Sequence, residues 1–334
     1  MNSIQGSLFA ENDPSADESS DSEVEYVFRT ANWLLGLMNQ PGIGPNKAIS
    51  IAKNFENLAS LSEADPMKLR KLLKGTDLNL AELREVDSTP PNDVKVLSYF
   101  DHDYPAGLRN LSNPPPILWY RGVIPKTAGV AIVGTRNPSS RGAALAFEAG
   151  RIVAQQDMAV VSGLAFGIDA AAHKGSLESG GANIAVLACD VRNPTPKANN
   201  DMAEEIIDKA GCLIAEVPPG TVTEARNLVA RNRIQAAWAN GLIMAECGIP
   251  SGTLHTVRFA LQINRPVAVF DPQILGSQSD SNAGNEALSN VNGCDPEILS
   301  VSGPFRDVIE ARKPCADRVL ESEETTQAFV SSLK

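Results

Sequence analysis

The strongest constraint on the fold is a set of six short apolar runs within residues 129–271, separated by stretches with helical periodicity. Within each run the apolar residues are continuous rather than alternating, which is typical of parallel strands buried on both faces. Helices that return the chain to the same edge of the sheet would cover those two faces. The sequence therefore predicts an α/β fold with a doubly wound parallel sheet, and the expected strands lie near residues 129–134, 158–163, 183–189, 212–217, 241–247 and 266–271.

The rest of the chain divides by composition. Ser, Asp and Glu dominate the first residues, apolar residues at helical spacing follow, and Thr89-Pro90-Pro91-Asn92 is typical of a linker. The chain turns polar again after the last apolar run, with one helix expected near residues 322–333. These changes predict a disordered acidic tail over residues 1–25, a small all-α domain over 26–90, the sheet domain over 91–275 and a polar C-terminal extension over 276–334.

Charge and composition narrow the possible functions. The 334 residues carry a net charge of -11, but the first 25 contain seven acids and no Lys or Arg, which leaves -4 for the remainder. A remainder this close to neutral permits a local basic cleft without long-range attraction to nucleic acid. Five scattered cysteines without a C-x-x-C pair favour reduced core residues over disulfides or zinc ligands. Because no apolar run approaches the roughly 18 residues of a membrane helix, we expect a cytoplasmic protein without a membrane or metal partner.

Two of the expected strands end in segments that suit an anionic ligand. The first ends in Gly134-Thr135-Arg136 and the second in Ser162-Gly163. Adjacent parallel strands end at the same edge of a sheet, where backbone N–H groups and a basic side chain can bind an anion. The planar guanidinium of Arg136 suits a phosphate. Neither a G-x-G-x-x-G fingerprint nor a P-loop follows, so NAD and ATP are unsupported and we expect no cofactor.

Two later segments are expected at the same edge. Arg231 and Arg233 lie at the start of a helix, where side chains two residues apart diverge by about 200°. One of them is therefore expected to meet the ligand and the other the core or a carboxylate, and Arg231 is the preferred ligand contact. The glycine-rich turn after the fifth strand places Ser251 at a helix cap and presents N–H groups to an anion.

The segment Gly42-Ile43-Gly44 lies between two helical stretches, in the pattern of a helix-hairpin-helix. Its glycines would let backbone N–H groups approach a DNA phosphate without obstruction by side chains. Gly42, Gly44 and Lys47 are the candidate contacts. A tight interhelical turn kept for packing explains the pattern equally well, so both interpretations stay open.

Several segments, in fixed order over about residues 30–275, resemble the DNA-processing protein family DprA/Smf. In this family a Y-P-x-x-N loop lines the DNA groove, and the resemblance implies that Lys197 and Asn199 lie there. Thr195 replaces a tyrosine that could stack on bases, and Phe166 replaces a basic residue. The segments that carry the resemblance are Gly134-Thr135-Arg136, Ser162-Gly163-Leu164-Ala165-Phe166-Gly167-Ile168-Asp169, Arg231-Asn232-Arg233-Ile234 and Ser251-Gly252-Thr253-Leu254.

The resemblance implies a Rossmann-like sheet domain preceded by a helix-hairpin-helix or SAM-like domain. It further implies a single-stranded DNA-binding protein rather than an enzyme, which protects incoming strands and assists loading of the RecA recombinase in transformation, generally as a homodimer. DNA contacts are then expected at Gly134, Thr135, Arg136, Ser162, Gly163, Phe166, Lys197, Asn199, Arg231, Arg233, Ser251, Gly252 and Thr253.

Two other functions stay open. Phosphoribohydrolases of the lysine decarboxylase-like type carry a catalytic glutamate after the fifth strand, but Thr256 occupies that position here, so the carboxylate that this chemistry needs is missing. A divergent relative could instead sense nucleic acid or nucleotides in phage defence. Phe166 would stack on a base or pack as a core aromatic. Asp169 and His173 are expected to cap and pack a helix rather than bind a metal.

Overall fold

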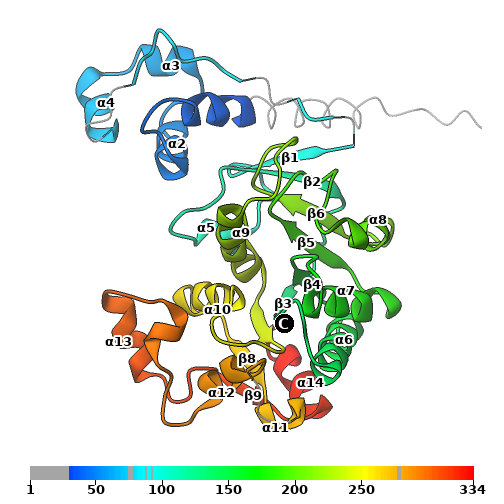
Figure 1. Ribbon diagram of the computed structural model, residues 1–334. Coiled ribbons are helices and arrows are strands. Elements are labelled where there is room, and N and C mark those ends of the chain that lie inside the picture. The colour runs from blue at the N-terminus through cyan, green and yellow to red at the C-terminus, as the bar shows by residue number, and fades with distance from the viewer. Residues whose placement is uncertain (1–29, 74–77, 87–88, 92, 277–279) are drawn as a thin grey trace, which may run out of the picture. The chain divides into compact units, whose positions relative to one another are not determined.

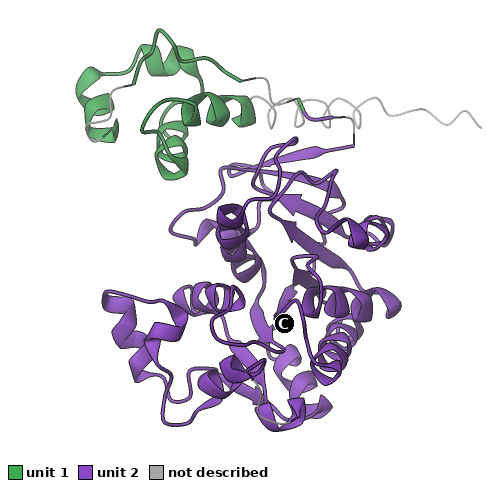
Figure 2. Cartoon of the chain, viewed as in Figure 1, with its two compact units in different colours: residues 1–89 green, residues 90–334 purple. Residues whose placement is uncertain are grey.

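The computed structural model describes residues 30–73, 78–86, 89–91, 93–276 and 280–334. The chain divides between residues 89 and 90 into two compact units, at the linker expected from the sequence (Figure 2). The acidic tail expected over residues 1–25 lies outside the described residues. Among the helices that are described, none combines the length and the apolar character needed to cross a membrane.

The elements described in the first unit are helices, as the periodicity predicts. A helical stretch over residues 30–38 precedes α2 (Pro45–Ala52), α3 (Leu58–Ser62) and α4 (Pro66–Leu73). Trp33 is buried in the core of this unit, and its indole Nε1 donates a hydrogen bond to the carbonyl O of Phe55 at 3.0 Å. The tryptophan thus contributes apolar area without leaving a buried donor unpaired.

The second unit is built on a sheet of nine strands in the order β1-β2-β6-β5-β4-β3-β7-β8-β9 (Figure 1). β2 pairs antiparallel with β1 and β6, and the other neighbours are parallel. The chain proceeds from β3 to β6 in one direction and continues with β7 on the other side of β3, so the order reverses between β3 and β7. The strands are β1 (Lys95–Ser98), β2 (Ile117–Gly122), β3 (Gly129–Val133), β4 (Ala159–Ser162), β5 (Asn183–Leu187), β6 (Cys212–Ala215), β7 (Gly241–Met244), β8 (Val267–Phe270) and β9 (Arg318–Leu320).

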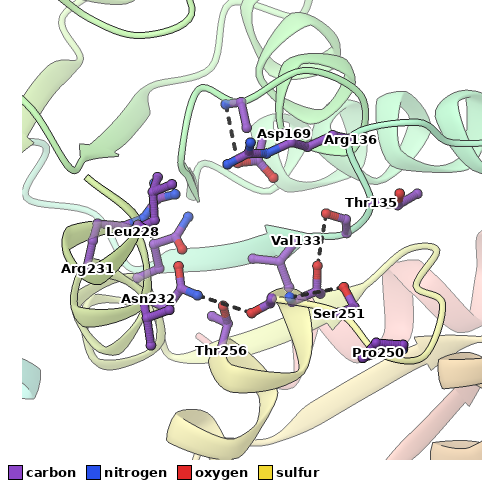
Figure 3. Close-up of a pocket in the computed structure, with 17 residues that line it drawn as sticks. Val133, Thr135, Arg136, Asp169, Leu228, Arg231, Asn232, Pro250, Ser251 and Thr256 are labelled. Atoms are coloured by element: carbon purple, nitrogen blue, oxygen red, sulfur yellow. Dashed lines mark hydrogen bonds between the residues drawn. The ribbon is translucent and has the colours of Figure 1, made fainter. Parts of the chain in front are cut away.

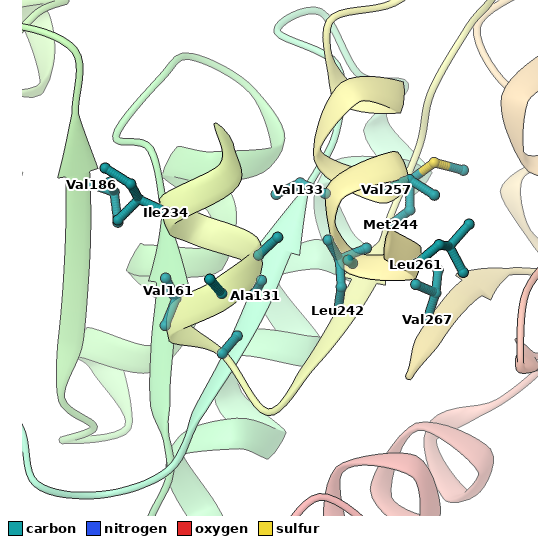
Figure 4. Packing of buried hydrophobic residues seen from close by; sticks show 14 of the residues in the cluster. Ala131, Val133, Val161, Val186, Ile234, Leu242, Met244, Val257, Leu261 and Val267 are labelled. Carbon is teal, nitrogen blue, oxygen red and sulfur yellow. The ribbon is translucent and has the colours of Figure 1, made fainter. Parts of the chain in front are cut away.

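Helices cover both faces of this sheet, which confirms the doubly wound fold. α9 and α10 pack on the face that carries Ala131 and Val133 (Figure 4), whereas α6 and α7 pack on the face that carries Val130 and Ile132. Alternate residues of β3 therefore enter two different cores, which explains its uninterrupted apolar sequence. The main helices of this unit are α6 (Ser140–Gln155), α7 (Ile168–Glu178), α8 (Asn200–Asp208), α9 (Ala225–Trp238), α10 (Thr253–Gln262), α13 (Pro304–Ala311) and α14 (Glu323–Ser331); shorter ones are α5 (Ala106–Arg109), η1 (Lys197–Asn199), α11 (Pro272–Leu275), α12 (Ala283–Ser289) and η2 (Pro296–Leu299).

The C-terminal region differs from the expected polar extension beyond the sheet domain. Its described residues belong to the second unit, where β9 pairs in parallel with β8. Phe329 and Val330 of α14 join the core on the α6 side of the sheet. The helix expected near residues 322–333 is present as α14. β9 was not predicted because a strand of three residues is too short to show a periodic pattern.

Candidate functional site

The reversal of strand order between β3 and β7 coincides with a cavity of about 500 Å³ at the carboxyl ends of these strands (Figure 3). Open α/β sheets bind ligands at such a reversal, in the crevice outside the carboxyl ends of the strands. Asn232 of α9 stands on one side of the cavity and Ser251 on the other, with the end of β3 between them. The charged residues that line it are Arg136, Asp169 and Arg231.

The loop after β3 brings Arg136 to this cavity. Gly134 is needed at the end of the strand, because a Cβ atom there would lie 2.5 Å from Cγ1 of Ile168. The next residue is also held within the protein, since the backbone N–H of Thr135 donates to the carbonyl O of Glu246 at 2.8 Å. Arg136 itself is exposed, and within the described part of the chain no hydrogen bond or ion pair engages its guanidinium. It remains the best candidate for phosphate contact.

Glu246, which follows β7, holds the β3–α6 loop through hydrogen bonds to Ser139. The sequence analysis did not identify this residue. The residue is only 1% exposed. Its Oε2 accepts hydrogen bonds from the backbone N and the Oγ of Ser139, both at 2.9 Å, and its Oε1 accepts one from Oγ of Ser281 at 2.7 Å. Ser139 caps α6, so the carboxylate lies at the positive end of that helix. The signal in the sequence is a single acidic residue near the end of the otherwise apolar run 241–247.

Arg231 reaches the same cavity from α9. It is only 8% exposed, and its Nη1 donates to the carbonyl O of Val186. Its Nε is buried and finds no hydrogen-bond partner in the part of the chain that the structure describes. Burial lowers the pKa of this guanidinium, and the positive charge of Arg136 lowers it further. The preferred ligand contact of the sequence analysis is therefore a buried cation that retains an unused donor.

Ser162 and Gly163 do not offer their donors to a ligand, contrary to expectation. The Oγ of Ser162 is buried and donates to the carbonyl O of Ile132 at 2.7 Å. The backbone N–H of Gly163 donates to Oδ2 of Asp169 at 3.0 Å. Gly163 is needed for another reason, because a Cβ atom there would overlap the guanidinium of Arg231. The donors of both residues are thus engaged in positioning the site.

The guanidinium of Arg233, another expected ligand contact, is engaged within the protein. Its Nη2 and Nη1 form hydrogen bonds with the carboxylate of Glu216 at 2.6 and 2.8 Å, and its Nε donates to the carbonyl O of Asn113 at 3.0 Å. This is the carboxylate partner that the divergence of Arg231 and Arg233 along the helix predicts. The bidentate pair leaves no free edge of the guanidinium for a phosphate.

The turn before α10 closes the cavity opposite α9. The N-cap of the helix is Gly252, one residue after the expected Ser251, whose Oγ still accepts a hydrogen bond from the backbone N of Thr253 at 3.2 Å. Oγ1 of Thr253 donates to the carbonyl O of Gly134 at 3.0 Å. Nδ2 of Asn232 donates to the carbonyl O of Gly252 at 3.2 Å. The structure thus brings these candidates to the site, where their side chains tie the loops together.

The loop after β5 carries two candidate contacts, and their surroundings differ. Lys197 is exposed at the start of η1. Asn199 is engaged, because its Nδ2 donates to the carbonyl O of Leu164 at 2.8 Å. Leu164 has a positive φ of 58°, an uncommon conformation for a leucine, and the asparagine helps to hold it. Asn199 is therefore a positioning residue for the loop that carries Phe166.

Phe166 is not a core aromatic. Its side chain is 49% exposed, and it lines a second hollow of about 250 Å³ together with Arg136, Thr195 and Arg231. The packing interpretation of this residue is wrong for that reason. An exposed ring beside two guanidinium groups suits stacking on an unpaired base.

We expect the Phe166→Ala variant to bind single-stranded DNA more weakly by about 1–3 kcal/mol, the usual value of base stacking on an aromatic ring. The melting temperature should stay unchanged because the ring is half exposed. Fluorescence anisotropy and thermal melting measure the two effects. Phe329→Ala is the contrasting variant, since this ring is buried and its loss should lower the melting temperature. A lower melting temperature without weaker binding in Phe166→Ala would refute the stacking role.

His173 packs α7 into the core as expected, whereas Asp169 does not cap this helix. The N-cap is Gly167, and Asp169 holds the loop before the helix instead. Oδ2 of Asp169 accepts the backbone N–H groups of Gly163 and Ala165 at 3.0 and 3.4 Å. His173 is fully buried, and its Nδ1 lies 2.9 Å from Oδ1 of Asn183. The amide nitrogen of Asn183 donates elsewhere, so Nδ1 carries the proton and the ring is neutral. Burial holds the pKa of His173 below its usual value.

We expect His173 to make the protein less stable in mild acid. As the pH falls below about 6.5, the unfolded chain binds a proton at this residue while the folded chain does not, so stability decreases by at most about 1.4 kcal/mol per pH unit. Urea unfolding between pH 7 and pH 5 measures this slope. The His173→Asn variant keeps a donor for Asn183 but does not titrate, and its slope should be flatter. An identical slope in both proteins would exclude His173 as the source.

The hairpin of the first unit has the geometry of a tight turn. Gly42 has a φ of 76°, which favours glycine, and Gly44 caps α2 with open space around its Cα. Nζ of Lys47 donates to the carbonyl O of Gly42 at 3.2 Å. The lysine therefore supports the turn. Both the DNA-contact and the packing interpretations of this hairpin agree with this geometry.

The fold and the cavity together define a Rossmann-like α/β protein with a cationic site at the reversal of its strand order. The chain belongs to the family described as DNA recombination-mediator protein A, whose model matches residues 95–292. This assignment confirms the family resemblance of the sequence motifs.

Related proteins cover a similar part of the chain. Protein Smf of Synechocystis is 32% identical over 242 residues, which are 68% of this chain and 61% of that protein. DNA processing protein DprA of Streptococcus pneumoniae is 35% identical over 185 residues, 55% of this chain and 65% of that protein. This chain spans less than two thirds of the length of either relative.

Solved structures share the fold. The X-ray structure of DNA processing protein A from S. pneumoniae has a TM-score of 0.60 at 24% identity and covers 92% of this chain and 96% of its own. DNA processing protein A from Helicobacter pylori, described for its single-stranded DNA binding mode, has a TM-score of 0.55 at 23% identity and covers 72% of this chain and 95% of its own.

Proposed function

We propose that this protein binds single-stranded DNA at the carboxyl edge of its sheet and acts as a DNA-processing protein rather than an enzyme. It would protect incoming strands and assist loading of the RecA recombinase, as a homodimer. The observation that carries this proposal is the pairing of two guanidinium groups without carboxylate partners, those of Arg136 and Arg231, with exposed apolar side chains around one cavity.

The residues around the cavity suit both the phosphates and the base faces of an unpaired strand. Guanidinium groups suit phosphates. Phe166 and Val229 are exposed large apolar residues; Val229 of α9 lines the cavity, and Phe166 lines the second hollow, which shares Arg136 and Arg231 with it. A single strand presents the faces of its bases to such residues, whereas a duplex keeps them stacked inside. Little sequence preference is expected because none of these groups reads base edges.

The nucleotide-cleaving alternative lacks a suitable carboxylate. Thr256 lines the cavity at the position where the phosphoribohydrolases carry glutamate. Among the described residues that line the cavity, Asp169 is the carboxylate, and its Oδ2 already accepts two backbone N–H groups. An acid or base that is held in this way is poorly placed for proton transfer to a ligand.

A binding assay tests the proposal. Fluorescence anisotropy with a 30-nucleotide single strand, its duplex and a panel of mononucleotides should give the highest affinity for the single strand and no turnover of the mononucleotides. Equal affinity for the duplex, or cleavage of a nucleotide, would contradict the proposed function. Faster RecA filament formation on a single strand in the presence of this protein would support the assigned role. Binding without that effect would favour a divergent sensor, to which the departures at Phe166 and Thr195 also point.

A further inference from the structure

Arg231 is an unusual residue for the interior of a protein. A buried guanidinium is normally paired with a carboxylate, because removal of a charge from water is costly. Among the described residues, Arg231 has no such hydrogen bond to a carboxylate, and its buried Nε has no hydrogen-bond partner. Arg233, two residues along the same helix, shows the usual solution, with a bidentate pair to Glu216. The contrast indicates that Arg231 is kept available for a ligand.

Two features of the protein hold the guanidinium of Arg231 in position. The carbonyl O of Val186 accepts from Nη1, and the absence of a Cβ atom at Gly163 leaves the space that the guanidinium fills. Asp169 contributes an opposing charge nearby, but its Oδ2 is engaged by the backbone of the β4–α7 loop. The arginine is therefore fixed in place without being neutralised by a direct ion pair.

A second cation faces the same space. Arg136 lines the cavity from the β3–α6 loop and is exposed, while Arg231 lies deep on α9. The two positive charges are close enough for Arg136 to lower the pKa of Arg231. An anion between them would relieve this repulsion. The cavity of about 500 Å³ is in the range of pockets that hold small ligands.

We propose that the cavity binds a terminal phosphomonoester of a nucleotide, in preference to a phosphodiester within a strand. A phosphomonoester carries a charge of about -1.5 to -2 near neutral pH and has three terminal oxygens. An internal phosphodiester has one charge and two such oxygens, and its two chain substituents hinder access to a deep guanidinium. The inference rests on the proposed function, because it assigns one end of the bound single strand to this cavity.

The test compares strands that differ only at their ends. The full-length protein is titrated into internally labelled 15-nucleotide single strands that carry a 5′-phosphate, a 3′-phosphate or hydroxyl groups at both ends. We expect one phosphorylated strand to bind about tenfold or more tightly than its hydroxyl twin, the effect of an added charge-assisted hydrogen bond. Equal affinities for all three strands would overturn the inference and leave single-strand binding intact. Failure of all three strands to bind would instead overturn the proposed function.

A competition experiment distinguishes the two sources of a terminal phosphate, a free nucleotide and the end of a strand. Deoxynucleoside 5′-monophosphates should displace the phosphorylated strand if the monoester alone suffices, and deoxynucleosides should not. Displacement by deoxynucleosides with equal strength would contradict recognition of the phosphate. A preference for the phosphorylated strand without displacement by monophosphates would assign the cavity to strand ends.

Two variants test whether Arg231 causes the preference for the phosphorylated strand. Arg231→Gln should remove the preference, so that the phosphorylated strand and its hydroxyl twin bind this variant with equal affinity, even where both bind more weakly than to the unchanged protein. Gly163→Ala keeps every charge and displaces the guanidinium, so it should reduce the preference even if Arg231→Gln does not fold. Gly163 lies outside the positive-φ region, so alanine is allowed there. The matched control is Arg226→Gln, an exposed arginine of α9 paired with Glu224. Retention of the full preference in folded Gly163→Ala would refute the role of Arg231.

Discussion

The Arg136→Ala variant should bind single-stranded DNA more weakly by about 1.5–3 kcal/mol, the value of a hydrogen bond to a charged group. This corresponds to a loss of about 10- to 150-fold in affinity. The reason is that the guanidinium of Arg136 lines the cavity without a partner in the described part of the protein, so its donors are free for a phosphate. Its removal costs no internal contact, and the melting temperature should not change. Anisotropy titrations with a 30-nucleotide strand measure the affinity.

The salt dependence provides an independent measure of the same contact. Loss of one phosphate contact on a single strand should reduce the slope of log affinity against log salt by about 0.7. Arg141→Ala is the matched control, because this exposed arginine begins the next helix and its Nε donates to the carbonyl O of Ile274 at 3.0 Å. Its slope should match that of the unchanged protein. If affinity and slope are both unchanged in Arg136→Ala, Arg136 does not contact the DNA.

The Glu246→Ala variant should show the largest loss of stability, about 3 kcal/mol in the free energy of unfolding. Removal of the carboxylate leaves the N–H and hydroxyl of Ser139 and the hydroxyl of Ser281 without their acceptor. An unsatisfied buried donor costs about 1–3 kcal/mol, and relief from burying the charge offsets part of the sum. Urea unfolding measures the change.

The Glu246→Gln variant is the control for this prediction. Its single amide oxygen can still accept both donors of Ser139, and its amide nitrogen can donate to Oγ of Ser281, so the loss should be about 1 kcal/mol. Because the carboxylate of Glu246 holds Ser139 in the same loop as Arg136, folded Glu246→Ala should also bind single-stranded DNA more weakly. Equal losses of stability in the two variants would show that the charge of the carboxylate matters rather than the number of its hydrogen bonds.

The central sheet could be predicted because its signal is local. The uninterrupted apolar sequence of β3, with Val130 and Ile132 on one face and Ala131 and Val133 on the other, follows from burial of both faces. Six such runs predicted six parallel strands, and the loops after the first, second and fifth meet at one cavity. Their meeting follows from the geometry of parallel strands, whose carboxyl ends share one edge of the sheet.

The family and the sheet were thus determined by the sequence alone, since both depend on residue types at fixed short spacing. Only the tertiary structure decided which of the candidate groups are free. Ser162, Gly163 and Arg233 are of the right type for a phosphate, but their donors are taken by Ile132, Asp169 and Glu216. The role of Glu246 in holding the β3–α6 loop depends on its hydrogen bond with Ser139, which lies 107 residues away in the sequence. Whether a donor is free depends on contacts between distant parts of the chain, and a local sequence pattern does not predict such contacts.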